Sequence, residues 1–245
     1  MGIASAVTLV HIAAGTVALV VAPAALVARK GGVWHRRTGA AFMYAMAGVT
    51  LTAAAMWQAK GHAFLLFLDI VSLYFVVSGY RVLIRRRRDG RDFRADGLDL
   101  AIAVAALACG LALIALGAAA ATPLLRSLAA VFLGLGAIGA IFASLELFAI
   151  GLGPKTKFGW LFYHLSAMLS AYISATTAFV VINAHGVPML ERWLVPVALG
   201  TATIVAFSVK YRVRFWRAAR RRPASAALRF DDRKRPSAAT VRRDR

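Results

Sequence analysis

Histidine side chains at four positions could carry chemistry in this chain. His11 and His164 lie inside long apolar segments, whereas His35 and His62 lie at the ends of such segments. An imidazole can bind a haem iron through one ring nitrogen, or it can take up and release a proton near neutral pH. Ionisable groups inside a bilayer cost about 2.5–3.5 kcal/mol each on insertion scales, so every one of them is a functional hypothesis by default.

Two carboxylates and one Tyr-Arg pair form a second set of candidates. Asp69 and Glu146 also lie inside apolar segments, and Tyr80-Arg81 lies near the end of one. Each buried carboxylate is expected either to belong to a proton or solute path or to bond a neighbouring helix and specify packing only. We therefore treat Asp69, Glu146, Tyr80 and Arg81 as candidate polar residues of the membrane interior.

Membrane-spanning helices are the elements that must position these residues. The chain has 245 residues, of which 60% are hydrophobic and 16% charged, whereas about 25% of residues are charged in a typical soluble domain. Apolar runs of about 20 residues, enough to cross a bilayer, recur along the sequence. The pattern predicts an all-α polytopic bundle with seven spans, at roughly 5–28, 38–58, 63–84, 98–121, 128–152, 158–183 and 193–210.

The basic residues predict how this bundle is oriented. Of 30 Lys and Arg residues, all but Lys60, Arg126 and Arg192 follow the first, third or fifth span, lie at the end of the third span (Arg81) or belong to the tail that begins at Lys210. Because basic loops stay on the cytoplasmic side, the N-terminus is expected outside and the C-terminus inside a bacterial inner membrane. The net charge of +20 then indicates contact with anionic lipid headgroups, and it does not favour nucleic-acid binding.

The segment 211–245 is expected to form a basic cytoplasmic tail. Its start, Tyr211-Arg212-Val213-Arg214-Phe215-Trp216, resembles an amphipathic helix lying on an anionic leaflet. From Pro223 onward the tail is poor in large apolar residues and is predicted to be disordered.

Depth in the membrane decides which histidines could share a ligand. At a rise of 1.5 Å per residue, His11 would lie roughly 9 Å below the outer boundary and His164 about 9 Å above the inner one. In a core of about 30 Å, their depths differ by roughly 12 Å. Depth therefore favours pairing His11 with His62 and His35 with His164, as in membrane cytochromes in which four helices hold two b-type haems. Without a cofactor, these histidines would be neutral and hydrogen-bonded between helices.

Three functions remain open from these residues. The first is b-type haem binding or quinone-linked electron transfer through His11 and His164, with His35 and His62 as partners. The second is a solute or proton-coupled transporter or a membrane sensor, in which Asp69 with His11 and Glu146 with His164 form an outer and an inner polar layer. The third is a membrane scaffold or assembly factor, which binds a partner through the basic tail.

Several simpler motifs are excluded or reinterpreted. Cys109 is the single cysteine, so the chain has no CxxCH motif for covalent haem. The GxGxxG match at Gly134–Gly139 lies in the middle of a predicted span, where it indicates helix packing and no dinucleotide site. We interpret the Arg85–Arg88 run as a topology signal. The sequence has no motif of a soluble enzyme, and it predicts no metal site other than haem. An enzyme that acts within the membrane stays an open alternative.

Several short motifs resemble those of an uncharacterised bacterial family of multi-pass membrane proteins. These are His11-x-x-x-Gly15, Lys30-Gly31, His35-Arg36-x-x-Gly39, Ser78-Gly79-Tyr80-Arg81 and Tyr163-His164-Leu165. The resemblance covers about half of the chain and implies a multi-pass membrane location, but it implies no activity. Members of that family often carry a His-Arg pair in the sixth span, whereas His164 here is followed by Leu165.

Overall fold

Seven α-helices make up the part of the chain that the structure describes. The structure is a computed structural model, and it describes residues 3–60, 63–89, 95–119, 123–152 and 158–220. No strand occurs within these residues. The helices are α1 (Ile3–Val27), α2 (Val33–Lys60), α3 (Ala63–Asp89), α4 (Gly97–Ala119), α5 (Pro123–Leu152), α6 (Gly159–Asn183) and α7 (Met189–Arg220). Each helix overlaps one of the predicted apolar segments, although α2 begins before the predicted residue 38 and α7 extends beyond the predicted 193–210 at both ends.

The composition of these helices suits a membrane. Over the described residues, six helices are long and apolar enough to cross one: α1, α2, α4, α5, α6 and α7. Large apolar side chains such as Leu51, Val20 and Leu199 are exposed by 72%, 65% and 66%. Such exposure is normal where the surrounding solvent is lipid. Helix α3 carries Asp69 in its first half and Arg81 and Arg85 towards its end, and it is not among the six.

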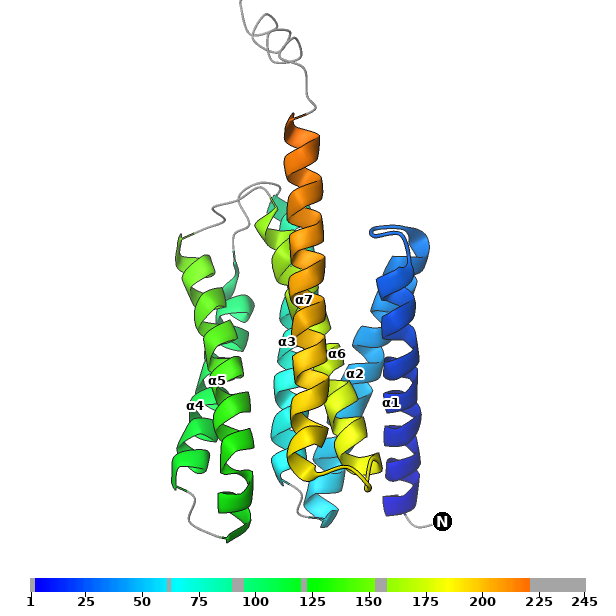
Figure 1. The fold of residues 1–245 in the computed structure, drawn as a ribbon, viewed down its shortest axis with the longest axis vertical. Coiled ribbons are helices and arrows are strands. Elements are labelled where there is room, and N and C mark those ends of the chain that lie inside the picture. The colour runs from blue at the N-terminus through cyan, green and yellow to red at the C-terminus, as the bar shows by residue number, and fades with distance from the viewer. Residues whose placement is uncertain (1–2, 61–62, 90–94, 120–122, 153–157, 221–245) are drawn as a thin grey trace, which may run out of the picture. The chain divides into compact units, whose positions relative to one another are not determined.

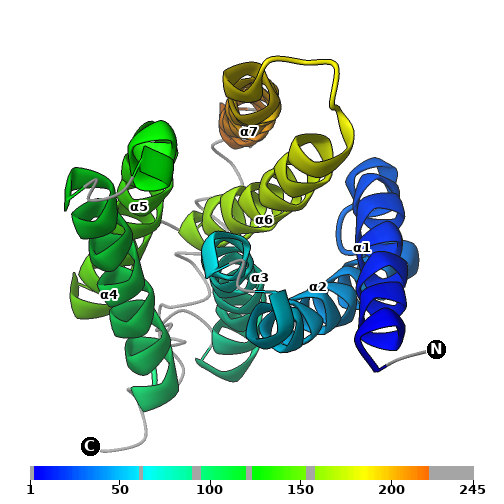
Figure 2. The same cartoon turned by 90° about the horizontal axis from the view of Figure 1, so that it is seen from below.

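The chain divides into two units, residues 1–204 and 205–245. Within the first unit, α1 packs against α2 and α4 packs against α5, so consecutive helices form two hairpins (Figures 1 and 2). Helix α3 contacts α2, α4 and α6, and α6 also contacts α1. The largest fully buried side chains include Met46 of α2, Phe75 of α3 and Leu113 of α4. The core therefore surrounds α3, which carries Ser72, Ser78 and Arg85, three of the eight buried polar or charged residues in the described part of the chain.

Glycine lets α4 and α5 approach closely. A Cβ added at Gly110 would lie 2.7 Å from the backbone nitrogen of Ala140, and one added at Gly136 would lie 2.7 Å from the carbonyl oxygen of Gly110. Gly134, two residues earlier, faces open space. The GxGxxG match thus contributes one packing glycine at the helix contact, as small residues do in membrane bundles.

Helix α7 begins beside α6. Arg192 donates from a terminal guanidinium nitrogen to the carbonyl oxygen of Val181 at 3.1 Å, and Gly200 lies against the side chain of Ile173. The helix continues beyond Lys210 to Arg220, so the basic start of the tail is a continuation of α7. Residues 221–245, for which disorder is predicted, lie outside the described residues.

Candidate functional site

His35 and His164 lie face to edge. His35 belongs to the first turn of α2 and His164 to the second turn of α6. Their ring centroids are 6.3 Å apart, and the ring planes are inclined by 80°. Both side chains are partly buried. His35 and His164, which the predicted membrane depth paired, thus lie next to each other although their helices are far apart in sequence.

A backbone carbonyl holds each of these imidazoles in place. Nδ1 of His35 lies 3.0 Å from the carbonyl oxygen of Ala25, and Nδ1 of His164 lies 2.8 Å from that of Gly79. Because a carbonyl oxygen can only accept, Nδ1 carries the proton and donates in both rings. In the neutral imidazole, Nε2 is then left with its lone pair. Metal-binding histidines use this arrangement, in which a hydrogen bond at one nitrogen orients the other.

The end of α1 explains the position of His35. The last carbonyls of a helix have no partner within the helix. Here Lys30 donates from Nζ to the carbonyl oxygens of Ala25 and Leu26, at 3.1 and 2.7 Å, and His35 adds its bond to Ala25. Gly31 has φ of +76° and forms the turn, a conformation that glycine adopts readily. The basic loop therefore closes the end of α1 and directs His35 towards α6.

His11 occupies a different place. Its Nδ1 lies 2.9 Å from the hydroxyl oxygen of Thr52 on α2. Thr52 also donates to the carbonyl oxygen of its own helix at Gly48, 2.7 Å away. His62, the expected partner of His11, lies outside the described residues, so that pairing stays a prediction.

Glu146 is the centre of a buried polar network. Its Oε2 accepts hydrogen bonds from the hydroxyls of Tyr74, at 2.9 Å, and Tyr163, at 2.6 Å. Its Oε1 accepts from Arg85 at 3.2 Å. Ser78 lies 2.6 Å from the Tyr163 hydroxyl, which already donates to Glu146, so Ser78 is the donor. Glu146 is only 3% exposed, and these bonds compensate for its loss of water.

The network extends to the start of α4 through two arginines. Arg85 lies 3.9 Å from Asp99, and Arg81 bonds both Asp99 and Asp96, the latter at 2.7 Å. The two aspartates also accept from each other's backbone N–H, at 3.0 and 3.1 Å, which forms a reciprocal cap on α4. Asp99 is 2% exposed. The arginines of α3 therefore connect the first turn of α4 to Glu146 on α5.

The histidine pair and this network share one seam between α3 and α6. Consecutive residues of α6, Tyr163 and His164, bond consecutive residues of α3, Ser78 and Gly79. A Cβ added at Gly79 would lie 3.0 Å from the Cβ of Ala167, so α6 packs closely on this glycine. Two motifs that the sequence placed in separate spans thus meet here.

Asp69 and Tyr80 stand apart from this seam. The backbone carbonyl of Asp69 accepts from Thr50 at 3.2 Å, but among the described residues its carboxylate has no hydrogen-bond partner. Tyr80 points outward and is 37% exposed. The outer polar layer of His11 and Asp69 therefore has no direct bond between its members in the described part of the chain.

The sequence did not predict a role in this network for Tyr74, Arg85 and Asp96, and it placed Ser78 and Tyr163 only in the motifs of a family resemblance. Arg85 was interpreted as part of a topology signal, yet it is 7% exposed and pairs with Glu146. Arg81 and Arg85 are four residues apart, so they share a helix face, and this spacing was an available signal. The Asp96-Gly-Leu-Asp99 spacing of a capping box was another.

Comparisons with known proteins add no assignment. No known family, no characterised protein and no solved structure matches this chain. Within the described ranges, no group of three or more His, Cys, Asp or Glu side chains is placed to hold a metal ion. The contacts of the histidines and of the Glu146 network are therefore the observations that bear on the chemistry of the site.

Proposed function

We propose that this chain is an integral membrane b-type haem protein that carries electrons, in which His35 and His164 would hold the haem. The observation that carries the proposal is that two histidines from helices far apart in sequence lie next to each other, with ring centroids 6.3 Å apart. In each ring, Nδ1 donates to a backbone carbonyl oxygen, so Nε2 is left as the nitrogen that would bind a metal.

The surroundings of the pair support this choice of group. Each Nδ1–H is bonded to a carbonyl oxygen, which leaves Nε2 as the ligating nitrogen. Among the residues that the structure describes, no third His, Cys, Asp or Glu joins the two imidazoles in a metal-binding group. Two imidazoles would suit a haem, whereas a tetrahedral zinc site takes three or four protein ligands. When bound, the haem would supply one-electron redox chemistry. The residues of this chain would fix the rings and keep water away.

The membrane setting of the proposal includes α3 as a seventh span. Its charged groups, Arg81 and Arg85, bond partners on α4 and α5, which is how ionisable groups persist in a membrane. The positions of the basic residues support an N-terminus outside and a C-terminus inside a bacterial inner membrane. The resemblance of the short motifs to those of an uncharacterised membrane-protein family stays an expectation, and it would agree with the same location.

The experiment is a visible spectrum of the full chain, expressed with haem supplementation, purified in detergent and recorded oxidised and dithionite-reduced. We expect a Soret band and, on reduction, the sharp bands of a six-coordinate low-spin haem. His35→Ala and His164→Ala should each abolish or shift these bands. His11→Ala and His185→Ala are matched controls, because His11 bonds Thr52 and His185 is exposed in the α6–α7 connection.

Two outcomes would overturn the proposal. One is the absence of a Soret band from folded protein under full haem supply. The other is a haem spectrum that neither His35→Ala nor His164→Ala alters. If His11→Ala alone removed the spectrum, the haem would belong to the outer membrane layer instead of the pair described above.

A further inference from the structure

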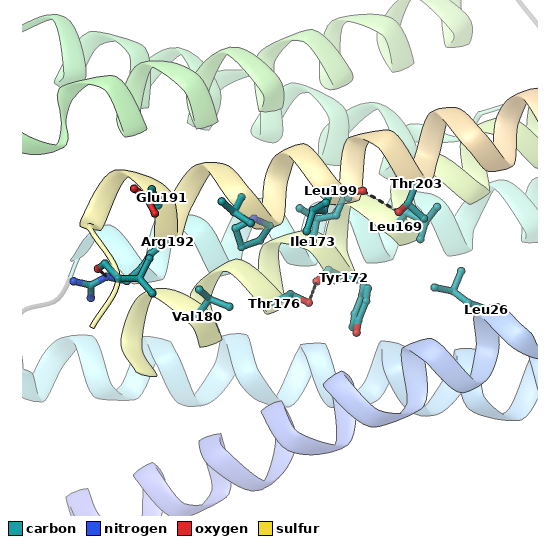
Figure 3. A pocket seen from close by; sticks show the side chains of 14 residues that line it. Leu26, Leu169, Tyr172, Ile173, Thr176, Val180, Glu191, Arg192, Leu199 and Thr203 are labelled. Carbon is teal, nitrogen blue, oxygen red and sulfur yellow. Dashed lines mark hydrogen bonds between the residues drawn. The ribbon is translucent and has the colours of Figure 1, made fainter. Parts of the chain in front are cut away.

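A groove lies along α6 and α7 within the first unit, and the end of α1 closes one part of it (Figure 3). Its volume is about 450 Å³, the size of a small-ligand pocket. Leu169 and Val180 of α6 line it together with Val195 and Leu199 of α7, and Leu26 of α1 completes it. These helices are among those apolar enough to cross a membrane, so the occupant that reaches the groove must be soluble in lipid.

The groove is also lined by the exposed Glu191 at the start of α7, but among the hydroxyl groups of the groove one is free to bind such a molecule. The hydroxyl of Tyr172 has no hydrogen-bond partner among the described residues. The threonine hydroxyls of the groove are already used, since Thr176 donates to the carbonyl oxygen of Tyr172 and Thr203 to that of Leu199, both within their own helices. Figure 3 shows the Tyr172 ring extending from α6 on the side of α1. Tyr172 therefore offers a donor to an acceptor on the occupant.

The groove ends beside the histidine pair. Leu26 directly follows Ala25, whose carbonyl oxygen accepts from His35. On α6, Leu169 and Tyr172 follow His164 by five and eight residues, which is a rise of roughly 8 and 12 Å along the helix. An occupant whose polar end reached Tyr172 would thus lie roughly 12 Å along α6 from His164.

We propose that this groove binds a membrane quinone, with Tyr172 donating to one carbonyl oxygen of the quinone ring and the isoprenoid tail lying along Val180, Val195 and Leu199. A quinone has the required parts, because its flat ring carries two acceptors and its tail is apolar. The choice of a quinone over other lipids rests on the proposed haem, since a haem within the membrane exchanges electrons with a lipid-soluble carrier.

The test uses the full chain in nanodiscs and a photoreactive azido-benzoquinone with a short tail as the probe. We expect mass spectrometry to map the label to α6 and α7, and an excess of decylubiquinone to prevent labelling. Tyr172→Phe should weaken probe binding by roughly fivefold, as expected for the loss of one hydrogen bond. Val195→Trp should fill the groove and block labelling. Tyr44→Phe is the matched control, because Tyr44 is 71% exposed and does not line the groove.

The outcomes separate this inference from the proposed function. Labelling of α6 and α7 in a protein without haem would support the groove and overturn the haem. A haem spectrum with label elsewhere, or with phospholipid alone extracted from the groove, would overturn the quinone site and leave the haem in place. Unchanged probe binding in folded Tyr172→Phe would remove Tyr172 from the site and overturn the proposed orientation.

Discussion

His164 on α6 donates a hydrogen bond from Nδ1 to the carbonyl oxygen of Gly79 on α3, 2.8 Å away. The bond is possible because Gly79 has no side chain. A Cβ at this position would lie 3.0 Å from the Cβ of Ala167 and 3.4 Å from the terminal methyl group of Met168. The close approach of α3 and α6 and the orientation of the His164 ring therefore both depend on the missing side chain of Gly79.

We expect Gly79→Ala to lower stability and to disturb the His164 ring. The added methyl group would push α6 away by a few tenths of an ångström and lengthen the bond from His164. Gly15→Ala is the control, because a Cβ there meets nothing within 4 Å and alanine favours a helix by about 0.5–1 kcal/mol. Thermal unfolding in detergent measures both variants. Equal midpoints for the two would contradict the close contact at Gly79.

Gly136→Ala should destabilise the α4–α5 hairpin far more than Gly134→Ala. The methyl group at Gly136 would meet backbone atoms of Gly110 and Ile114 within 3.0 Å, and backbone cannot rotate away as a side chain can. Overpacking of this kind costs about 1–3 kcal/mol. Gly134 has open space and serves as the control in the same motif. The readout is the midpoint of unfolding, and a larger loss for Gly134→Ala would refute the packing described here.

Glu146→Ala should cost about 3–5 kcal/mol of folding free energy, because removing one partner of a buried ion pair leaves the other uncompensated. Tyr163→Phe should cost about 1 kcal/mol, the value of one hydrogen bond, and Tyr44→Phe should cost little because Tyr44 is exposed. Chemical or thermal unfolding in detergent ranks the three variants.

A double replacement tests whether Arg85 and Glu146 act together. Glu146→Gln combined with Arg85→Met removes both charges of the 3.2 Å pair, so its cost should be smaller than the sum of the two single costs. Arg85 also lies 3.9 Å from Asp99, so part of the cost of Arg85→Met will remain. Strict additivity of the two costs would show that the pair contributes no coupling.

Arg81→Lys should destabilise the protein although it keeps the charge. The guanidinium of Arg81 reaches Asp96 and Asp99 through two different nitrogens, and a single ammonium group cannot reproduce that fork. The loss should be about 1.5–3 kcal/mol, the range for hydrogen bonds to charged groups. Arg86→Lys is the control, because Arg86 is exposed and stacks over the Trp160 ring at 3.7 Å. Similar losses in both would argue against a special role for Arg81.

Apolar length predicted the seven helices because a bilayer requires about 20 apolar residues in a row. Depth arithmetic also placed His35 near His164, since each lies close to a helix end on the same side. It did not identify which helix faces would meet. Helices rich in Ala, Leu and Gly offer many similar faces, and the α3–α6 contact depends on the bonds of Ser78 and Gly79.

Arg85 shows why the charged network was harder to predict. Four consecutive arginines after an apolar segment are a strong topology signal, and that signal concealed one residue that turns inward. Arg85 is identified as that residue by its partners, which are Asp99 on α4 and Glu146 on α5. The ligand roles of His11, His35, His62 and His164 remain predictions.

The pairing of α3 with α6 also determines the order in which the molecule can be completed during synthesis. The α1–α2 and α4–α5 hairpins join neighbours in the chain, so each can form as soon as its second helix has left the ribosome. The hydrogen bond from Tyr163 to Glu146 and the packing of α6 on Gly79 can form only after α6 has been synthesised. A nascent chain arrested before α6 would leave Glu146 with the donors Tyr74 and Arg85 but without Tyr163.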